Sequence, residues 1–326
     1  MKVYLSKKFR TNFYHIHSRL HRDFSSLYYL QGTDVVTNIE QYFDFAHFVD
    51  IYAKSEIAYV KEHLKKKVIV NYFVRKLPKF SGISDVRIPF EDKRILNKCD
   101  LILVSCQADK MILIANEVRT PIEILTPALS EERYSKMSPL ERGSFAQYAG
   151  LLKDEQTAFA VVNYRNVQDI QDLIALAESM KNLSFYVFGP KVKVFSTSGK
   201  ISKMIKKAPK NLHFKAYVSE DIFKSAVVTS KVFIVTREAE LEIINILEAM
   251  IAKTQVVTFN NHFTGDVLID DVNCIVACSP EQMAEKIQSV LDGKAGTVEE
   301  AWREAREYDY DSRGKILKEI VKNCIE

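Results

Sequence analysis

Three of the glutamates that follow the apolar run 232–235 in this chain of 326 residues are candidate site residues. Glu240 lies in a short acidic loop, Glu242 lies at the start of the helix predicted over 241–251, and Glu248 lies on that helix about two turns beyond Glu240. Carboxylates at a strand-to-helix turn face the crevice where open α/β sheets bind ligands, and the N–H groups that open such a helix bind phosphate. The alternative is that these glutamates are solvated charges on the helix surface, where acidic residues favour the first turn.

The segments around these glutamates alternate between apolar runs and amphipathic stretches. This alternation predicts parallel sheets flanked by helices. In the N-terminal half we expect strands at 3–5, 35–37, 45–49, 68–73, 101–104 and 122–125, with helices at 17–30, 54–65 and 108–118. In the C-terminal half we expect strands at 158–163, 185–188, 213–217 and 232–235, with helices at 167–180, 201–207 and 219–227.

The length of the chain predicts two domains, because single cores rarely grow to this size. We place the N-terminal domain at 1–150, ending in a polar, irregular passage over 130–150. The C-terminal domain spans 151–295. Terminal helices over 296–326 are expected to pack back toward the N-terminal domain. The hydrophobic share of 47% is enough for two well-packed cores.

Several segments together resemble a known family. The pattern of Glu240, Glu242 and Glu248-Ala-Met, followed by Val256-Val257, resembles the donor-site signature of the retaining glycosyltransferases of family 4. Further similar segments lie at 183–189, 211–218 and 266–276. The resemblance implies an α/β fold of the GT-B type, with two Rossmann-like doubly wound domains facing a cleft. Within the family the chain is most similar to the diacylglycerol glycolipid synthases of Gram-positive bacteria and mollicutes.

The resemblance implies a retaining transfer of a hexosyl group from a nucleotide sugar, a UDP-sugar in our expectation, to a hydroxyl acceptor such as a membrane glycolipid. Glu240 would be the catalytic-site residue at the donor sugar, and Glu248 would accept from the ribose hydroxyls of the nucleotide. Glu242, Arg165 and Gly189 would complete the donor site. The acceptor would bind on the 1–150 side, and neither a cofactor nor a metal ion is expected.

The expected diphosphate site departs from the family pattern. The family has two cations at the start of the first helix of the second domain, and these positions fall on Val167 and Gln168. Such cations stabilise a leaving diphosphate. Only Arg165 is close, and Asp169 replaces a glycine where its charge would repel phosphate. The departure supports an alternative function, a non-catalytic GT-B module that is a partner or regulatory subunit of an active glycosyltransferase.

A family histidine in the N-terminal domain is also replaced. Its position, after the strand at 68–70, falls near Asn71, and a glycine-rich loop has no counterpart at 7–14. His47, at the end of an earlier strand, is a weak substitute on the acceptor side. We favour the alternative that His47 is a buried histidine with its hydrogen bonds satisfied.

Charge is unevenly distributed along the chain. Residues 1–150 carry 23 Lys and Arg against 17 Asp and Glu, whereas residues 151–326 carry 23 against 25. Lys65, Lys66 and Lys67, near several tyrosines, predict contact with an anionic membrane surface on the acceptor side. The alternative is that these lysines end a helix, where cations suit the helix dipole.

Other functional classes lack their sequence signals. Five cysteines without framework spacing indicate reduced thiols, and no apolar run approaches a membrane span or a secretory leader. Walker A, Gly-x-Gly-x-x-Gly and Gly-x-Ser-x-Gly motifs are absent from the sequence. We therefore expect a cytoplasmic protein, peripheral at the inner face of the membrane, that binds no nucleic acid. A glycosyltransferase partner or a second copy of the chain is the protein partner we expect.

Overall fold

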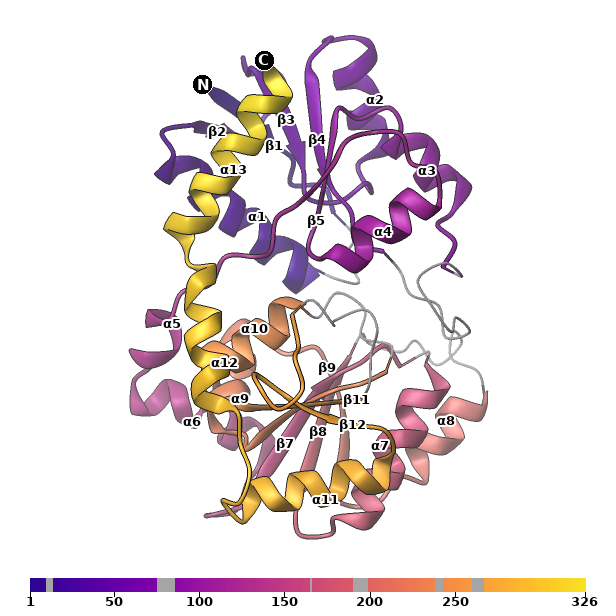
Figure 1. Cartoon of the computed structure of the whole chain (residues 1–326), viewed down its shortest axis with the longest axis vertical. Coiled ribbons are helices and arrows are strands. Elements are labelled where there is room, and N and C mark those ends of the chain that lie inside the picture. Colours follow the sequence, from indigo (N-terminus) through magenta and orange to yellow (C-terminus); the bar gives the residue numbers. More distant parts are fainter. Residues whose placement is uncertain (10–13, 75–85, 165, 190–198, 238–242, 260–266) are drawn as a thin grey trace. The chain divides into compact units, whose positions relative to one another are not determined.

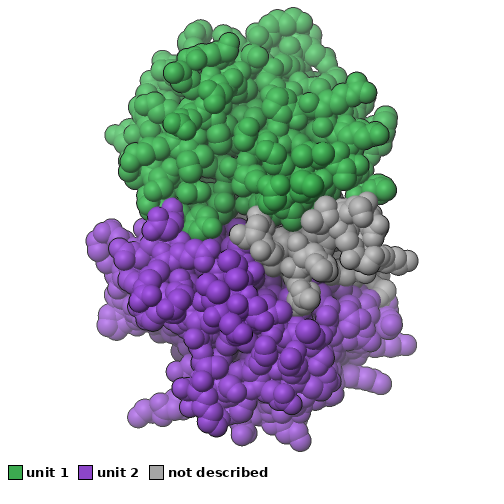
Figure 2. Space-filling view, in the orientation of Figure 1, with its two compact units in different colours: residues 1–75, 79–128, 308–326 green, residues 76–78, 129–307 purple. Residues whose placement is uncertain are grey.

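The computed structural model describes residues 1–9, 14–74, 86–164, 166–189, 199–237, 243–259 and 267–326. The chain divides into two compact units, shown in Figure 2. Unit 1 comprises residues 1–75, 79–128 and 308–326, and unit 2 comprises residues 76–78 and 129–307. Glu240, Glu242 and Arg165, which we predicted as site residues, lie outside the described residues.

Unit 1 is a parallel six-stranded sheet with the order β2-β1-β3-β4-β5-β6 (Figure 1). Its strands are β1 (Lys2–Leu5), β2 (Asp34–Val36), β3 (Phe45–Phe48), β4 (Lys67–Asn71), β5 (Leu101–Val104) and β6 (Ile122–Ile124). Its helices are α1 (Tyr14–Leu30), α2 (Lys54–Glu62), α3 (Phe90–Leu96), α4 (Gln107–Ala115) and α13 (Tyr310–Ile325). The central strands read as apolar runs because helices cover both faces of such a sheet.

Unit 2 repeats this architecture, with the parallel order β12-β11-β10-β7-β8-β9. Its strands are β7 (Thr157–Val161), β8 (Ser184–Gly189), β9 (Leu212–Ala216), β10 (Val232–Val235), β11 (Gln255–Phe259) and β12 (Ile275–Ala277). Its helices are α5 (Glu132–Ser135), α6 (Pro139–Ala149), α7 (Val167–Ser179), α8 (Gly199–Lys206), α9 (Glu220–Thr229), α10 (Ile243–Ile251), α11 (Pro280–Leu291) and α12 (Val298–Ala305). The prediction of two parallel α/β domains is confirmed.

The segment 130–150 is not the irregular passage that we predicted, because it forms α5 and α6. Ser138 and Glu141 form a capping box at the start of α6, and Gly150 ends the helix with a φ of 70°. The Ser-x-x-Glu pattern with proline at the first position was the available sequence signal. The Ser225 hydroxyl on α9 accepts from the Phe145 N–H at 2.9 Å, so the segment packs within unit 2 rather than with the N-terminal sheet.

The C-terminal segment forms two helices, α12 and α13. A short 3₁₀ turn separates α12 from α13, and Asp309 caps α13 by accepting from the Ser312 N–H at 2.8 Å. Residues 308–326 belong to unit 1, where Tyr310 donates a hydrogen bond to Asp23 on α1. Apart from residues 76–78, the chain therefore enters unit 2 at residue 129 and returns to unit 1 at residue 308.

Candidate functional site

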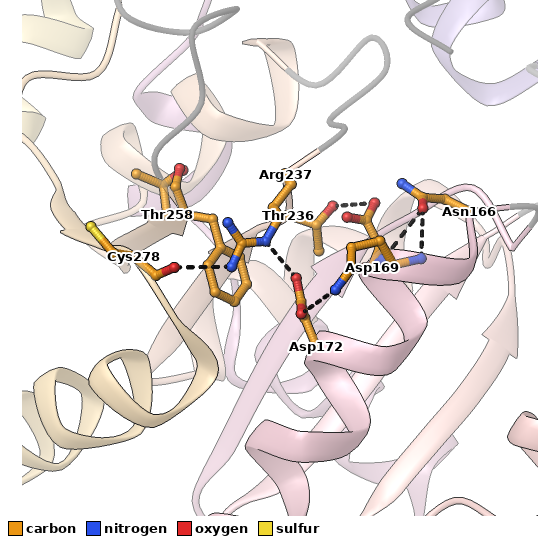
Figure 3. A network of polar contacts seen from close by, with 9 residues as sticks. Asn166, Asp169, Asp172, Thr236, Arg237, Thr258 and Cys278 are labelled. Carbon is orange, nitrogen blue, oxygen red and sulfur yellow. Dashed lines mark hydrogen bonds and ion pairs between the residues drawn. The ribbon is translucent and has the colours of Figure 1, made fainter. Parts of the chain in front are cut away.

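The first turn of α7 lies at the carboxyl edge of the unit 2 sheet, directly after β7. Asn166 caps this helix, and its side-chain oxygen accepts from the N–H groups of Gln168 and Asp169 at 3.0 and 3.3 Å (Figure 3). Two of the N–H groups that open the helix are thus satisfied by the protein itself. The cap fixes where the side chains of the next two turns lie.

Two buried carboxylates follow on α7. Asp169 is 1% exposed and accepts from the Thr236 hydroxyl at 2.9 Å. Asp172 accepts from the Gln168 amide at 2.9 Å and pairs with Arg237, whose Nε lies 2.7 Å away. Asp169 is turned toward the end of β10, as Figure 3 shows, rather than toward solvent.

Arg237 is a candidate site residue that our sequence reasoning missed. It follows β10 and is held by three contacts: Asp172, the Cys278 carbonyl at 3.1 Å, and the Phe259 ring at 4.3 Å (Figure 3). Its side chain is 32% exposed, and its Nη1 donates to no residue in the part of the chain that the structure describes. A cation therefore lies beside α7 with one donor group available. An arginine two residues after an apolar strand was the signal in the sequence.

Glu248 lies on α10, whose nine residues are all buried. Glu248 is 1% exposed, and its Oε1 accepts a hydrogen bond from the Tyr134 hydroxyl on α5. Burying a carboxylate is costly unless hydrogen bonds stabilise it. Glu248 is therefore not a solvated charge on a helix surface, which was the alternative for this residue.

Gly189 ends β8 where the chain after β7 passes over it. A Cβ at this position would lie 2.6 Å from the Val162 carbonyl oxygen and 2.8 Å from the Tyr164 ring. Such contacts cannot be accommodated without moving the backbone. The packing of the segment that leads into α7 thus explains the glycine, and its contact with a donor remains a prediction.

His47 is fully buried in unit 1, on β3. Its Nε2 lies 2.7 Å from Asn71 Oδ1 and its Nδ1 lies 2.8 Å from the Tyr28 hydroxyl. Because an amide oxygen only accepts, Nε2 donates to Asn71 and Nδ1 accepts from Tyr28. Asn71 also lines a small pocket, together with Leu20, Asp23, Phe24, Leu27, Phe73, Ser105, Leu125, Thr126, Pro127 and Ala128.

Burial lowers the pKa of His47 to about 4. The unfolded histidine takes up a proton as the pH falls below about 6.5, whereas the folded one stays neutral, so the unfolded state binds more protons. We expect the free energy of unfolding to fall by about 2 kcal/mol between pH 6.5 and 5 because of this residue alone. Urea unfolding at several pH values measures the fall.

The matched control for this prediction is His47→Gln, which keeps polar groups at the site but cannot titrate. Its unfolding free energy must show a shallower pH dependence over the same window. His21, whose pKa burial also lowers, is present in both proteins and cancels in the comparison. If the unfolding free energies of the two proteins depend equally on pH, the lowered pKa of His47 is contradicted.

Lys65 and Lys66 lie between α2 and β4, and Lys67 is the first residue of β4. Lys65 has a left-handed φ of 53°, and the Lys66 N–H closes the turn onto the Val60 carbonyl at 3.2 Å. The Lys66 ammonium lies 5.1 Å from the centre of the Tyr42 ring, and Lys67 lies 3.6 Å from Asp100. Two of the three cations thus have contacts within unit 1.

Neither a metal cluster nor a membrane span is found in the described part of the chain. No group of three or more His, Cys, Asp or Glu side chains there is placed to hold a metal ion. Of the helices that the structure describes, none is both long enough and apolar enough to cross a bilayer.

A family model and a curated relative both match a large part of this chain. Residues 145–308 match the family described as Glycosyl transferases group 1. The chain is 22% identical over 263 residues, 80% of its length and 74% of the relative's, to the processive diacylglycerol alpha-glucosyltransferase of Acholeplasma laidlawii.

Solved structures share the fold. Anabaena HepE in complex with UDP-glucose has a TM-score of 0.71 at 13% identity, covering 99% of this chain and 100% of that protein. WaaG, a glycosyltransferase involved in lipopolysaccharide biosynthesis, has a TM-score of 0.60 at 16% identity, covering 98% and 99% of the two chains. The predicted GT-B fold is confirmed by these neighbours.

Proposed function

This chain belongs to the glycosyl transferases group 1 family, and we propose that it moves a hexosyl group from a UDP-sugar to a hydroxyl of a membrane glycolipid. That it is a glycosyltransferase follows from its family; the donor, the acceptor and retention of configuration are the proposal. The alternative of a non-catalytic partner subunit finds no support among the relatives.

Arg237 is the observation that carries the proposal for the donor. The sequence lacks the family's two cations at Val167 and Gln168, yet a guanidinium with an available donor lies beside the same helix. A leaving diphosphate needs such a cation as its charge develops. Because Asp172 neutralises part of the arginine charge, we propose that Nη1 binds one phosphate oxygen and that Arg165 adds a second cation.

The carboxylates complete the proposed donor site. Glu248 is a buried acceptor on α10, and we assign to it the ribose hydroxyls of the nucleotide. We assign Glu240 to the donor sugar, and we assign Glu242 to the support of the loop that carries Glu240. The bound UDP-glucose of Anabaena HepE supports a uridine donor. The acceptor hydroxyl would attack from the side of the leaving group, and we assign no metal ion or cofactor to this step.

The acceptor proposal rests on the diacylglycerol glucosyltransferase relative and on unit 1. Most side chains that line the small pocket beside Asn71 are apolar, and we propose that the apolar part of the acceptor packs against them. We assign Asn71 to hold an acceptor hydroxyl and His47 to position Asn71. Lys65, Lys66 and Lys67 would contact the membrane at the inner face of the cell.

Titration of UDP, UDP-glucose and GDP into the full chain tests the donor, and transfer of labelled glucose to vesicles containing diacylglycerol or glucosyl-diacylglycerol tests the acceptor. We expect UDP and UDP-glucose to bind and GDP to bind more weakly. Absence of binding for all three nucleotides would overturn the donor assignment. Binding without transfer to either lipid would overturn the acceptor assignment.

A further inference from the structure

A cationic surface in unit 2 stands apart from the rest of that unit. The sequence between residues 180 and 218 contains nine lysines and no aspartate or glutamate. The other residues of 129–307 carry 13 Lys and Arg against 24 Asp and Glu. The positive charge of unit 2 is therefore concentrated in one segment, although the C-terminal half as a whole is slightly acidic.

Helix α8 and the turn after it display this charge. Their five lysines are all exposed: Lys200, Lys203, Lys206, Lys207 and Lys210. On a helix, residues three and four positions apart share one face, so the first four lysines form a single cationic stripe. Figure 1 shows α8 on the outside of unit 2, beside α7.

The opposite face of α8 is already occupied. Ile201 is 3% exposed, and Ala208, just beyond the helix, packs against the core of unit 2. The helix is thus held in place by its apolar side and cannot insert that side into a membrane. Its cationic stripe is left to face outward.

Lys181 extends the stripe at the end of the helix. It lies in the turn between α7 and β8, and the Asn211 amide bonds the carbonyls of Met180 and Leu183 in that turn, each at 3.0 Å. Because Asn211 directly follows Lys210, the two exposed lysines flank this contact. We call Lys181, Lys200, Lys203, Lys206, Lys207 and Lys210 the α8 surface.

The α8 surface has no anionic partner within the described residues, where no ion pair involves any of its six lysines. Like charges three and four positions apart destabilise a helix. The arrangement is therefore unfavourable for the isolated protein and becomes favourable when an external anion neutralises it.

The chemistry of the surface selects the kind of anion. Residues 199–210 contain no aromatic side chain, so they offer no stacking platform for nucleic-acid bases. The segment contains no arginine, whose fork binds single phosphate groups in a defined geometry. Hydrated lysine ammonium groups on a broad face suit a diffuse and laterally mobile array of charge, which is what an anionic lipid surface presents.

We propose that the α8 surface binds anionic lipid headgroups and holds unit 2 at a bilayer. The inference depends on the proposed function in one respect: the role of the surface would be to keep the donor domain close to a lipid acceptor. The surface is separate from Lys65, Lys66 and Lys67, which lie in unit 1. Its contribution is therefore testable by itself.

The experiment compares three full-length proteins in sedimentation with vesicles. They are the wild type, a variant with Lys200, Lys203, Lys206 and Lys207 replaced by glutamine, and a control with the exposed Lys136, Lys153, Lys231 and Lys294 replaced by glutamine. The vesicles are phosphatidylcholine alone or with one third phosphatidylglycerol. The two variants lose the same charge. A difference in their vesicle binding therefore depends on where the replaced lysines lie.

We expect the wild type and the control to bind the anionic vesicles and to be released as salt rises above about 0.1 M. The α8 variant should bind at least about 30-fold more weakly, because several lysines contribute additively near an anionic surface. Equal binding of the two variants, equal binding of the wild type to phosphatidylcholine alone, or no binding at all would overturn the proposal. Loss of binding to a single-stranded oligonucleotide, with vesicle binding intact, would reassign the surface to nucleic acid.

Titration of UDP-glucose into the same proteins without vesicles separates this inference from the proposed function. The α8 variant should bind the donor as the wild type does. If no protein binds a nucleotide while the vesicle results hold, the donor assignment fails and the membrane surface stands. If the proteins bind the nucleotide but the vesicle results fail, only the proposal for the α8 surface is wrong.

Discussion

Replacing Glu248 by glutamine is expected to weaken the binding of UDP-glucose by about 10- to 100-fold. A glutamine side chain has the same shape, but it presents one acceptor oxygen where the carboxylate presents two. Hydrogen bonds to a charged acceptor contribute about 1.5–3 kcal/mol each, which corresponds to this range. Isothermal titration of UDP and UDP-glucose measures the change.

The matched control is Tyr134→Phe, which removes the hydrogen bond to Glu248 Oε1 and leaves the carboxylate in place. We expect this variant to lose some stability, because the carboxylate is buried, and to keep most of its affinity for the nucleotide. Urea unfolding of all three proteins checks that each is folded. If Glu248→Gln binds UDP-glucose as tightly as the wild type, Glu248 is a structural residue and the ribose assignment is wrong.

Replacing Arg237 by methionine is expected to lower kcat/KM by about 100-fold, because removing a group that stabilises developing charge typically costs at least this much. The same change leaves Asp172 without the cation that it pairs with at 2.7 Å. We therefore also expect the free energy of unfolding to fall by about 3 kcal/mol, the lower end for a buried pair, since the arginine is partly exposed. Steady-state transfer kinetics and urea unfolding measure the two effects.

A second variant separates these two effects. Asp172→Asn combined with Arg237→Met removes the uncompensated charge, while the asparagine still accepts from Gln168. The double variant should regain most of the lost stability and remain as slow as the single variant. Recovery of activity together with stability would mean that Arg237 only neutralises Asp172. Arg237→Lys should be intermediate, because a lysine cannot keep the contacts to Asp172, Cys278 and Phe259 at once.

The sequence predicted the fold because the information for a parallel α/β sheet is local. Apolar runs of four or five residues, such as those at 101–104 and 232–235, have to be buried on both faces, and amphipathic helices between them cover the sheet. The position of Glu248 on a helix after such a strand could be read in the same way. Where local prediction failed, as at 130–150, a capping box was present in the sequence but was not used.

The candidate site depends on contacts that no local pattern contains. Arg237 meets Asp172 across 65 positions of sequence, and Glu248 meets Tyr134 across 114. His47 reaches Asn71 from a neighbouring strand, which turns a candidate site histidine into a buried one with a lowered pKa. By itself the sequence determined the strands, the helices and the family, because periodicity and local motifs specify them. Only the tertiary structure decided which charges pair and which stay exposed, because burial and partner distance arise when the sheet brings distant strand ends together.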